Sequence, residues 1–265
     1  MRTLQNIQLL PVIQLYPPDM NYPMPRLDTA EEHYAFWKDV MTSNGLQDIE
    51  PIQKGLHYVS FDAITDADLK RLMELHLKDF EPFTKSGVAE GEVKDYLPHS
   101  LEGGVILMAD GVAEIPPQCC VSLQDYKEWI AIKETTDFEF IWLGHPWIYY
   151  KMKGEQIYFT RLIEKDFAGK WRYYQPTSKG VFMGGWEADY FLKKGEIIED
   201  SDILYEISTQ ELFKKIEQLQ LAINIFKQRI EAIGKALNFK NPNLIATCLV
   251  DGNGQTFSYD RDNLR

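Results

Sequence analysis

The sequence contains little of what marks a disulfide-rich or membrane-bound protein. Its 265 residues include only three cysteines, Cys119, Cys120 and Cys248, and an odd number with one adjacent pair does not form a secreted disulfide framework. No run approaches the roughly 18 consecutive apolar residues that a membrane helix needs. The first ten residues also lack the apolar core and the cleavage site of a signal peptide. We therefore expect a cytoplasmic protein that does not associate with membranes.

Basic side chains are outnumbered, with 28 Lys and Arg against 40 Asp and Glu, which gives a net charge of -12. Binding to nucleic acid needs clustered Lys and Arg, so no nucleic-acid partner is expected. Residues 206–265 hold eight basic and seven acidic side chains, a balance of +1, which leaves -13 for residues 1–205. Such a field attracts basic protein surfaces and speeds their encounter, although solubility alone is the simpler explanation.

The sequence also lacks the short motifs of common catalytic and nucleotide-binding sites. It contains no G-x-G-x-x-G or G-x-x-x-x-G-K-[ST] loop, no G-x-S-x-G and no H-E-x-x-H, the patterns that bind phosphates, place a nucleophile or ligate zinc. We therefore expect no cofactor, and no motif assigns a reaction.

What is present is the composition of a folded globular protein, with 45% hydrophobic and 13% aromatic residues. Short apolar runs bounded by turn residues predict strands near residues 8, 57, 105, 117, 140, 148 and 158. Capped amphipathic segments predict helices near residues 30–43, 66–79, 122–133 and 208–239. The predicted fold class is α+β, an antiparallel or mixed sheet covered by helices, with a long C-terminal helix.

Two units are predicted along the chain. Residues 1–205 form the α+β domain, and residues 206–265 form a long amphipathic helix followed by a short hairpin tail. The turn signal for this hairpin is Asp251-Gly252-Asn253-Gly254, between apolar runs at 245–250 and 255–259.

The long helix is the clearest element, because Ser208-Thr209-Gln210-Glu211 has the spacing of a capping box. After it, apolar residues recur at alternating steps of four and three, which is a heptad seam. The seam consists of Leu212, Ile216, Leu219, Ile223, Phe226, Ile230, Ile233 and Leu237. It packs either on the body of its own protomer or on a second copy. In the second case the homodimer interface consists of Ile216, Leu219, Ile223, Phe226, Ile230 and Ile233.

The adjacent pair Cys119–Cys120 is the most unusual dipeptide and is a weak candidate for a nucleophile or a zinc site. Either chemistry needs histidine partners, and His99 and His145 are the nearest in sequence. Adjacent side chains of a strand point to opposite faces, so both thiols reach one metal only if the chain turns there, which the two preceding prolines allow. The simpler interpretation is a pair of small buried side chains.

His145 is the second candidate, because it lies between Trp142 and Trp147. An imidazole between two indoles could act as a base in a closed pocket. It could equally be a core histidine that is hydrogen-bonded to a carbonyl. An enzyme with a thiol or metal site near Cys119, Cys120 and His145 is therefore the alternative to a binding function.

Residues 115–129, Ile-Pro-Pro-Gln-Cys-Cys-Val-Ser-Leu-Gln-Asp-Tyr-Lys-Glu-Trp, and residues 142–147, Trp-Leu-Gly-His-Pro-Trp, resemble segments of a set of uncharacterised bacterial proteins. Some of those resemble immunity-type proteins that neutralise toxins. The resemblance covers residues 115–158, about a fifth of the chain, and implies no activity and no catalytic residues. Together with the acidic charge, it favours a protein-interaction module of immunity type that binds a basic partner.

Overall fold

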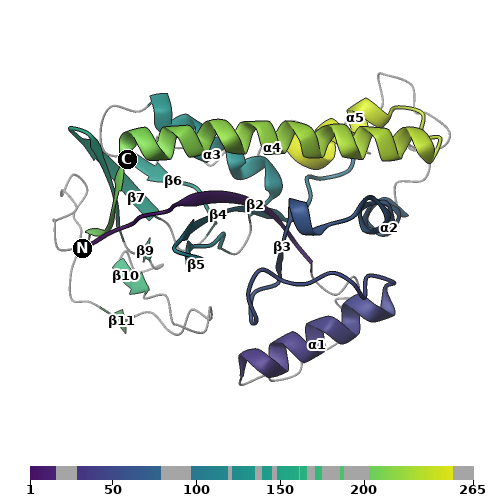
Figure 1. Cartoon of the computed structure of the whole chain (residues 1–265), viewed down its shortest axis with the longest axis horizontal. Helices are drawn as coiled ribbons and strands as arrows, with labels where there is room; N and C mark the ends of the chain where they lie inside the picture. Colours follow the sequence, from purple (N-terminus) through teal and green to yellow (C-terminus); the bar gives the residue numbers. More distant parts are fainter. Residues whose placement is uncertain are drawn as a thin grey trace.

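The computed structural model describes residues 1–15, 29–78, 97–118, 121–134, 139–144, 148–160, 162–165, 171–174, 186–187 and 203–252. These residues form an α+β fold, which confirms the predicted class. Two larger sheets, one antiparallel and one mixed, lie under the long helix α4 (Thr209–Ala236), which crosses the molecule in Figure 1.

The antiparallel sheet has the strand order β3-β2-β4-β5. Its strands are β2 (Gln8–Gln14), β3 (Tyr58–Ser60), β4 (Gly103–Ala109) and β5 (Val112–Ile115). β4 is buried along its whole length, and a Cβ on Gly103 would lie 2.2 Å from the carbonyl oxygen of Val12 in β2. Pro11 is tolerated within β2 because β3 pairs only with Val12–Gln14, so the missing N–H lies where β2 has one neighbouring strand.

The mixed sheet has the order β1-β12-β8-β7-β6. Its strands are β1 (Arg2–Thr3), β12 (Ile203–Ser208), β8 (Gln156–Thr160), β7 (Ile148–Lys153) and β6 (Glu139–Ile141). β1 runs parallel to β12 and the other pairs are antiparallel, and β7 and β8 form a hairpin. The expected domain boundary between residues 205 and 206 thus falls inside β12. A small third sheet consists of β9 (Leu162–Lys165), β10 (Trp171–Tyr174) and β11 (Trp186–Glu187).

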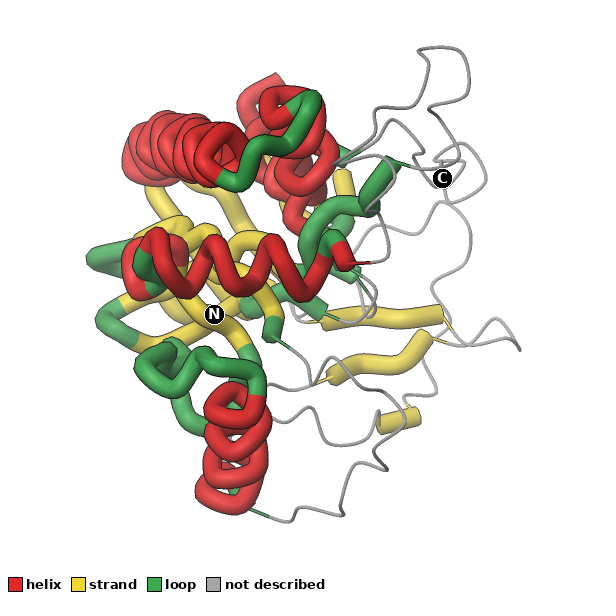
Figure 2. The backbone as a smooth tube through the Cα atoms, turned by 90° about the vertical axis from the view of Figure 1, so that its right-hand side faces the viewer, coloured by secondary structure: helices red, strands yellow, loops and turns green. Residues whose placement is uncertain are grey.

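The remaining helices are α1 (Ala30–Ser43), α2 (Asp66–His76), α3 (Tyr126–Ala131) and α5 (Pro242–Asp251), with short 3-10 turns η1 (Phe61–Ala63), η5 (Leu123–Asp125) and η6 (Ile132–Glu134). Thr29 and Thr65 cap α1 and α2, each in a reciprocal capping box. In Figures 1 and 2, α4 and α5 lie side by side, and α1 lies at the opposite end of the molecule.

The heptad seam of α4 faces the body of its own protomer. All six side chains expected at a homodimer interface are buried there, in one core cluster with both larger sheets. They are Ile216, Leu219, Ile223, Phe226, Ile230 and Ile233. The structure therefore has the first of the two arrangements, since α4 covers apolar strands that would otherwise face water. A second copy could use these side chains only if α4 left the body.

The C-terminal tail corrects another expectation, because the first strand of the expected hairpin, 245–250, lies within helix α5. Pro242 occupies the first turn of α5, where its fixed φ and missing N–H suit a helix start. The apolar residues Ile245, Ala246, Cys248 and Leu249 then pack on the common core. The second expected strand lies outside the described residues.

Candidate functional site

Three of the four predicted site residues, Cys119, Cys120 and His145, lie outside the described residues, so their chemistry stays a prediction. The fourth, His99, is exposed, and its backbone carbonyl lies 3.4 Å from Nε2 of His76. Within the described part of the chain, no group of three or more His, Cys, Asp or Glu side chains is arranged to hold a metal ion.

The structure brings together the two segments that lead into Cys119 and His145. The backbone N–H of Gln118 donates to the carbonyl oxygen of Leu143 at 2.6 Å. One residue earlier, the Tyr58 hydroxyl donates to the carbonyl oxygen of Pro117 at 3.0 Å. The described contact is thus between residues 118 and 143, and it does not extend to Cys119, Cys120 or His145.

Sequence reasoning did not select a half-buried carboxyl group in the turn before α3, that of Asp125. Asp125 accepts hydrogen bonds from the backbone N–H of Ser122 at 2.8 Å and from its hydroxyl at 3.4 Å. Burial is the main cause that raises the pKa of Asp125 from 3.8 to about 6; the nearby Glu128 also raises it, while the hydrogen bonds from Ser122 lower it. The Ser-x-x-Asp spacing of a capping box was the available signal. A carboxyl that titrates near neutral pH can exchange a proton there, but its oxygens are engaged in closing η5.

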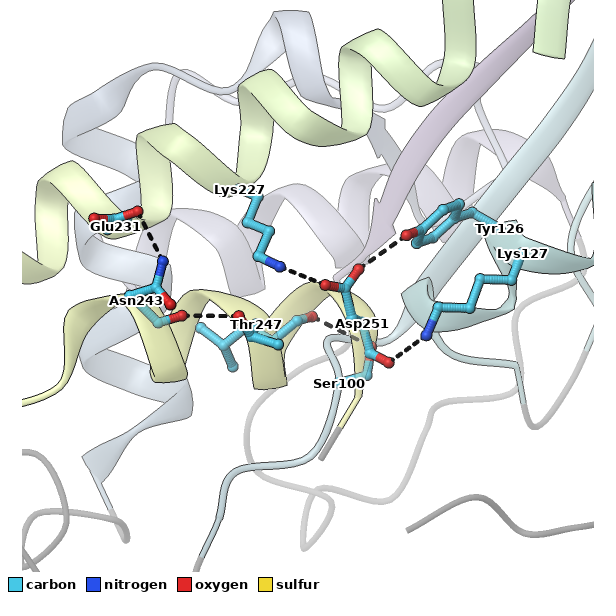
Figure 3. A network of polar contacts seen from close by, with 9 residues as sticks. Ser100, Tyr126, Lys127, Lys227, Glu231, Asn243, Thr247 and Asp251 are labelled. Carbon is cyan, nitrogen blue, oxygen red and sulfur yellow. Dashed lines mark hydrogen bonds and ion pairs between the residues drawn. The ribbon is translucent and has the colours of Figure 1, made fainter. Parts of the chain in front are cut away.

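A second polar network joins three helices around Asp251, at the end of α5 (Figure 3). Its carboxylate accepts from the Tyr126 hydroxyl at 2.9 Å and pairs with the Lys227 ammonium of α4 at 2.5 Å. Its backbone carbonyl accepts from Lys127 Nζ at 2.7 Å. Below it, the Ser100 hydroxyl donates to the carbonyl oxygen of Leu249 at 3.2 Å. Asp251 therefore satisfies partners on α3 and α4, which makes it a structural junction.

The acidic and basic side chains are also unevenly distributed among the elements of the structure. Residues 29–78, here called the acidic segment, carry nine acidic and five basic side chains, a balance of -4. Eight of those carboxylates are exposed: Glu31, Glu32, Asp39, Asp48, Glu50, Asp62, Asp66 and Glu74. By contrast, α4 carries five basic and three acidic side chains, a balance of +2.

Some carboxylates of the acidic segment are compensated and others are not. Glu50 pairs with Lys38, and Asp66 pairs with Arg229 of α4 at 2.9 Å. In the described part of the chain, no ion pair involves Asp39, Asp48 or Asp62. The acidic segment therefore presents free negative charge on α1, on the loop after it and on η1.

No protein-family model, no curated protein and no solved structure matches this chain. The resemblance of residues 115–158 to immunity-type proteins therefore stays a prediction. Among the helices that the structure describes, none is long and apolar enough to cross a bilayer.

Proposed function

We propose that this chain is a protein-interaction module that binds a basic surface of a partner protein through the acidic segment. The observation that carries the proposal is the set of exposed carboxylates on residues 29–78, of which Asp39, Asp48 and Asp62 have no ion-pair partner among the described residues. Surface charges of one sign attract an oppositely charged partner over about a Debye length, roughly 8–10 Å. The resemblance to immunity-type proteins supports the same class of partner.

The strength expected of such a surface is modest and depends on salt. An exposed ion pair contributes about 0.2–1 kcal/mol, so removing three free carboxylates should weaken binding by about 3- to 160-fold. The main effect of such charges is on the association rate and on partner choice. The partner's own apolar contacts would supply the remaining affinity.

The test compares two triple variants that change the net charge equally. The first is Asp39→Asn/Asp48→Asn/Asp62→Asn in the acidic segment, and the control is Glu102→Gln/Glu134→Gln/Glu155→Gln, at three exposed acids elsewhere. Binding of a fluorescent deca-lysine peptide is followed by anisotropy at low and high salt. The first variant should bind more weakly, while the control stays within about twofold of the wild type. Equal weakening would show general attraction to net charge and would end the proposal.

A third variant separates binding from thiol chemistry. Cys119→Ser/Cys120→Ser leaves every carboxylate of the acidic segment in place. Under the proposal its affinity for the peptide equals that of the wild type. A loss of binding as large as that of the acidic-segment variant would transfer the function to the region of the two cysteines.

A further inference from the structure

The outward face of α4 carries an uncharged patch that the fold leaves uncovered. Leu221 is 61% exposed and Ile225 is 49% exposed, one helical turn apart. The other exposed side chains between residues 218 and 228 are Gln218, Asn224 and Gln228. A chain with 40 acidic residues thus presents three turns of helix surface with no exposed charge. Exposed aliphatic side chains that adjoin on one helix face mark an interaction surface more often than isolated ones do.

We propose that two copies of this chain associate through the outward faces of their α4 helices, which run antiparallel about a two-fold axis near residue 223. In that arrangement, residue 223 − n of one copy lies opposite residue 223 + n of the other. Leu221 then lies opposite Ile225 of the second copy, and Gln218 lies opposite Gln228. The patch is therefore complementary to itself, as a two-fold interface requires.

The charges at the edges of this face select the same arrangement. Antiparallel pairing about residue 223 sets Glu217 opposite Arg229 and Lys235 opposite Glu211, whose carboxylate also accepts from the N–H of Ile7 in its own protomer. A parallel pairing would place every one of these residues opposite its own copy, with like charges together. Like charges in opposition disfavour an arrangement strongly. The charge order along α4 thus specifies the direction of pairing.

The edge charges already have partners within the protomer, which limits what they contribute. Glu217 pairs with Lys133 at 2.9 Å, and Arg229 pairs with Asp66 at 2.9 Å. Shared ion pairs at a solvated rim orient two surfaces more than they hold them together. With four aliphatic side chains at its centre, the interface should give a weak dimer, with a dissociation constant on the order of 100 µM.

A second copy is the occupant that the charges favour. The whole chain carries -12, so two copies repel each other over most of their surface. The balance of +2 on α4 makes this helix a region where the approach of another acidic copy is least opposed. The seam residues on the inward face stay buried in this dimer, so association requires no unfolding. The acidic segment meets this face at one edge, where Asp66 pairs with Arg229, while α1 lies at the other end of the molecule (Figure 1).

A charge-swap experiment tests both the face and the direction. Leu221→Lys and Ile225→Glu are made separately in the full chain, and sedimentation equilibrium is measured from about 10 µM to 1 mM. Each variant alone should dissociate at least about tenfold more readily, because a charge then faces an aliphatic side chain twice per dimer. In the antiparallel mixed dimer, the introduced lysine faces the introduced glutamate, and Leu221 faces Ile225. Mixing the two variants should therefore restore association.

Matched controls make the outcome decisive. Both substitutions are at exposed positions, and thermal unfolding will check that each variant folds. Val112→Lys alters an aliphatic residue of similar exposure, 52%, on β5, and should leave association unchanged. A wild-type chain that is monomeric at 1 mM would overturn the proposal. So would variants that dimerise like the wild type, a mixture that stays monomeric, or a loss of dimer in Val112→Lys.

Discussion

The inward and outward faces of α4 have opposite relations to the rest of the chain. Inward, seven apolar side chains are buried in one core cluster with both larger sheets. Outward, between residues 218 and 228, five uncharged residues are exposed, two of them aliphatic. A heptad seam therefore indicates a buried face without saying which body covers it. The face that a partner can reach has the weaker apolar pattern, because the heptad seam is already covered by the sheets of its own protomer.

A pair of substitutions at neighbouring positions, one on each face of α4, tests this difference with the largest expected effect. Phe226 is 1% exposed and stacks on Phe61, with ring centroids 3.8 Å apart. Phe226→Ala should lower the free energy of unfolding by about 3–5 kcal/mol, because it removes buried area and leaves a cavity. Ile225→Ala, on the outward face, should change it by about 0.5 kcal/mol or less. Urea unfolding at low protein concentration measures both, and similar losses would show that the two faces are not distinct.

Solution pH should change the free energy of unfolding through groups that are partly shielded from solvent. The pKa of Asp125 is raised by burial to about 6, so between pH 4 and 6 the folded chain binds more protons than the unfolded chain. Stability due to this group is fully present below pH 4 and falls as pH rises to 6, by about 2–3 kcal/mol. Burial lowers the pKa values of His57 and His76, whose contribution instead falls as pH drops below 6.5.

The variant Asp125→Asn isolates this effect. An asparagine oxygen can still accept from the Ser122 N–H, but it does not titrate. The free energy of unfolding of the variant, relative to the wild type, should rise steadily from pH 4 to pH 6, while the histidine contributions cancel in the difference. Chemical unfolding at five pH values across this interval provides the measurement. Parallel curves for the two proteins would mean that Asp125 is not a titrating buried group.

Local signals predicted the helix starts well, and contacts between distant residues account for what they missed. Thr29, Thr65 and Ser208 cap three of the helices that the pattern predicted, because an N-cap depends on a few adjacent residues. Glu211 was expected to complete a box with Ser208, but its carboxylate accepts from the N–H of Ile7 at 3.3 Å. A partner 204 residues away cannot be read from spacing.

The tail and the site show the same limit. The run 245–250 is short and apolar, a pattern that does not separate a strand from a buried helix, and α5 forms because it can pack beside α4. Asp251 was assigned to a turn, yet it joins Tyr126 and Lys227, which come from two other helices. The mixed sheet likewise includes the pairing of β1 with β12, in which Arg2 lies opposite Tyr205.

Asp251 offers a smaller perturbation at the border between the two faces, where Lys227 is 27% exposed. Asp251→Ala removes the acceptor of the Tyr126 hydroxyl and the counter-ion of Lys227 at once. The expected loss of unfolding free energy is about 1–2 kcal/mol. Asp251→Asn keeps an acceptor for Tyr126 and should lose less, with a difference from alanine that persists in high salt. Equal effects of the two variants would show that the hydrogen bond contributes nothing.

The smallest effect on the free energy of unfolding is expected at the N-terminal end of α4. The Ser208 side chain accepts from the N–H of Glu211 at 3.5 Å, and Ser208→Ala should cost about 0.5–1 kcal/mol. The next hydroxyl, on Thr209, is buried with no hydrogen-bond partner in the part of the chain that the structure describes. Thr209→Val should therefore be neutral or slightly stabilising, because it removes an unsatisfied polar group. Thermal unfolding of the two variants ranks them, and a larger loss for Thr209→Val would place the cap of α4 one residue later.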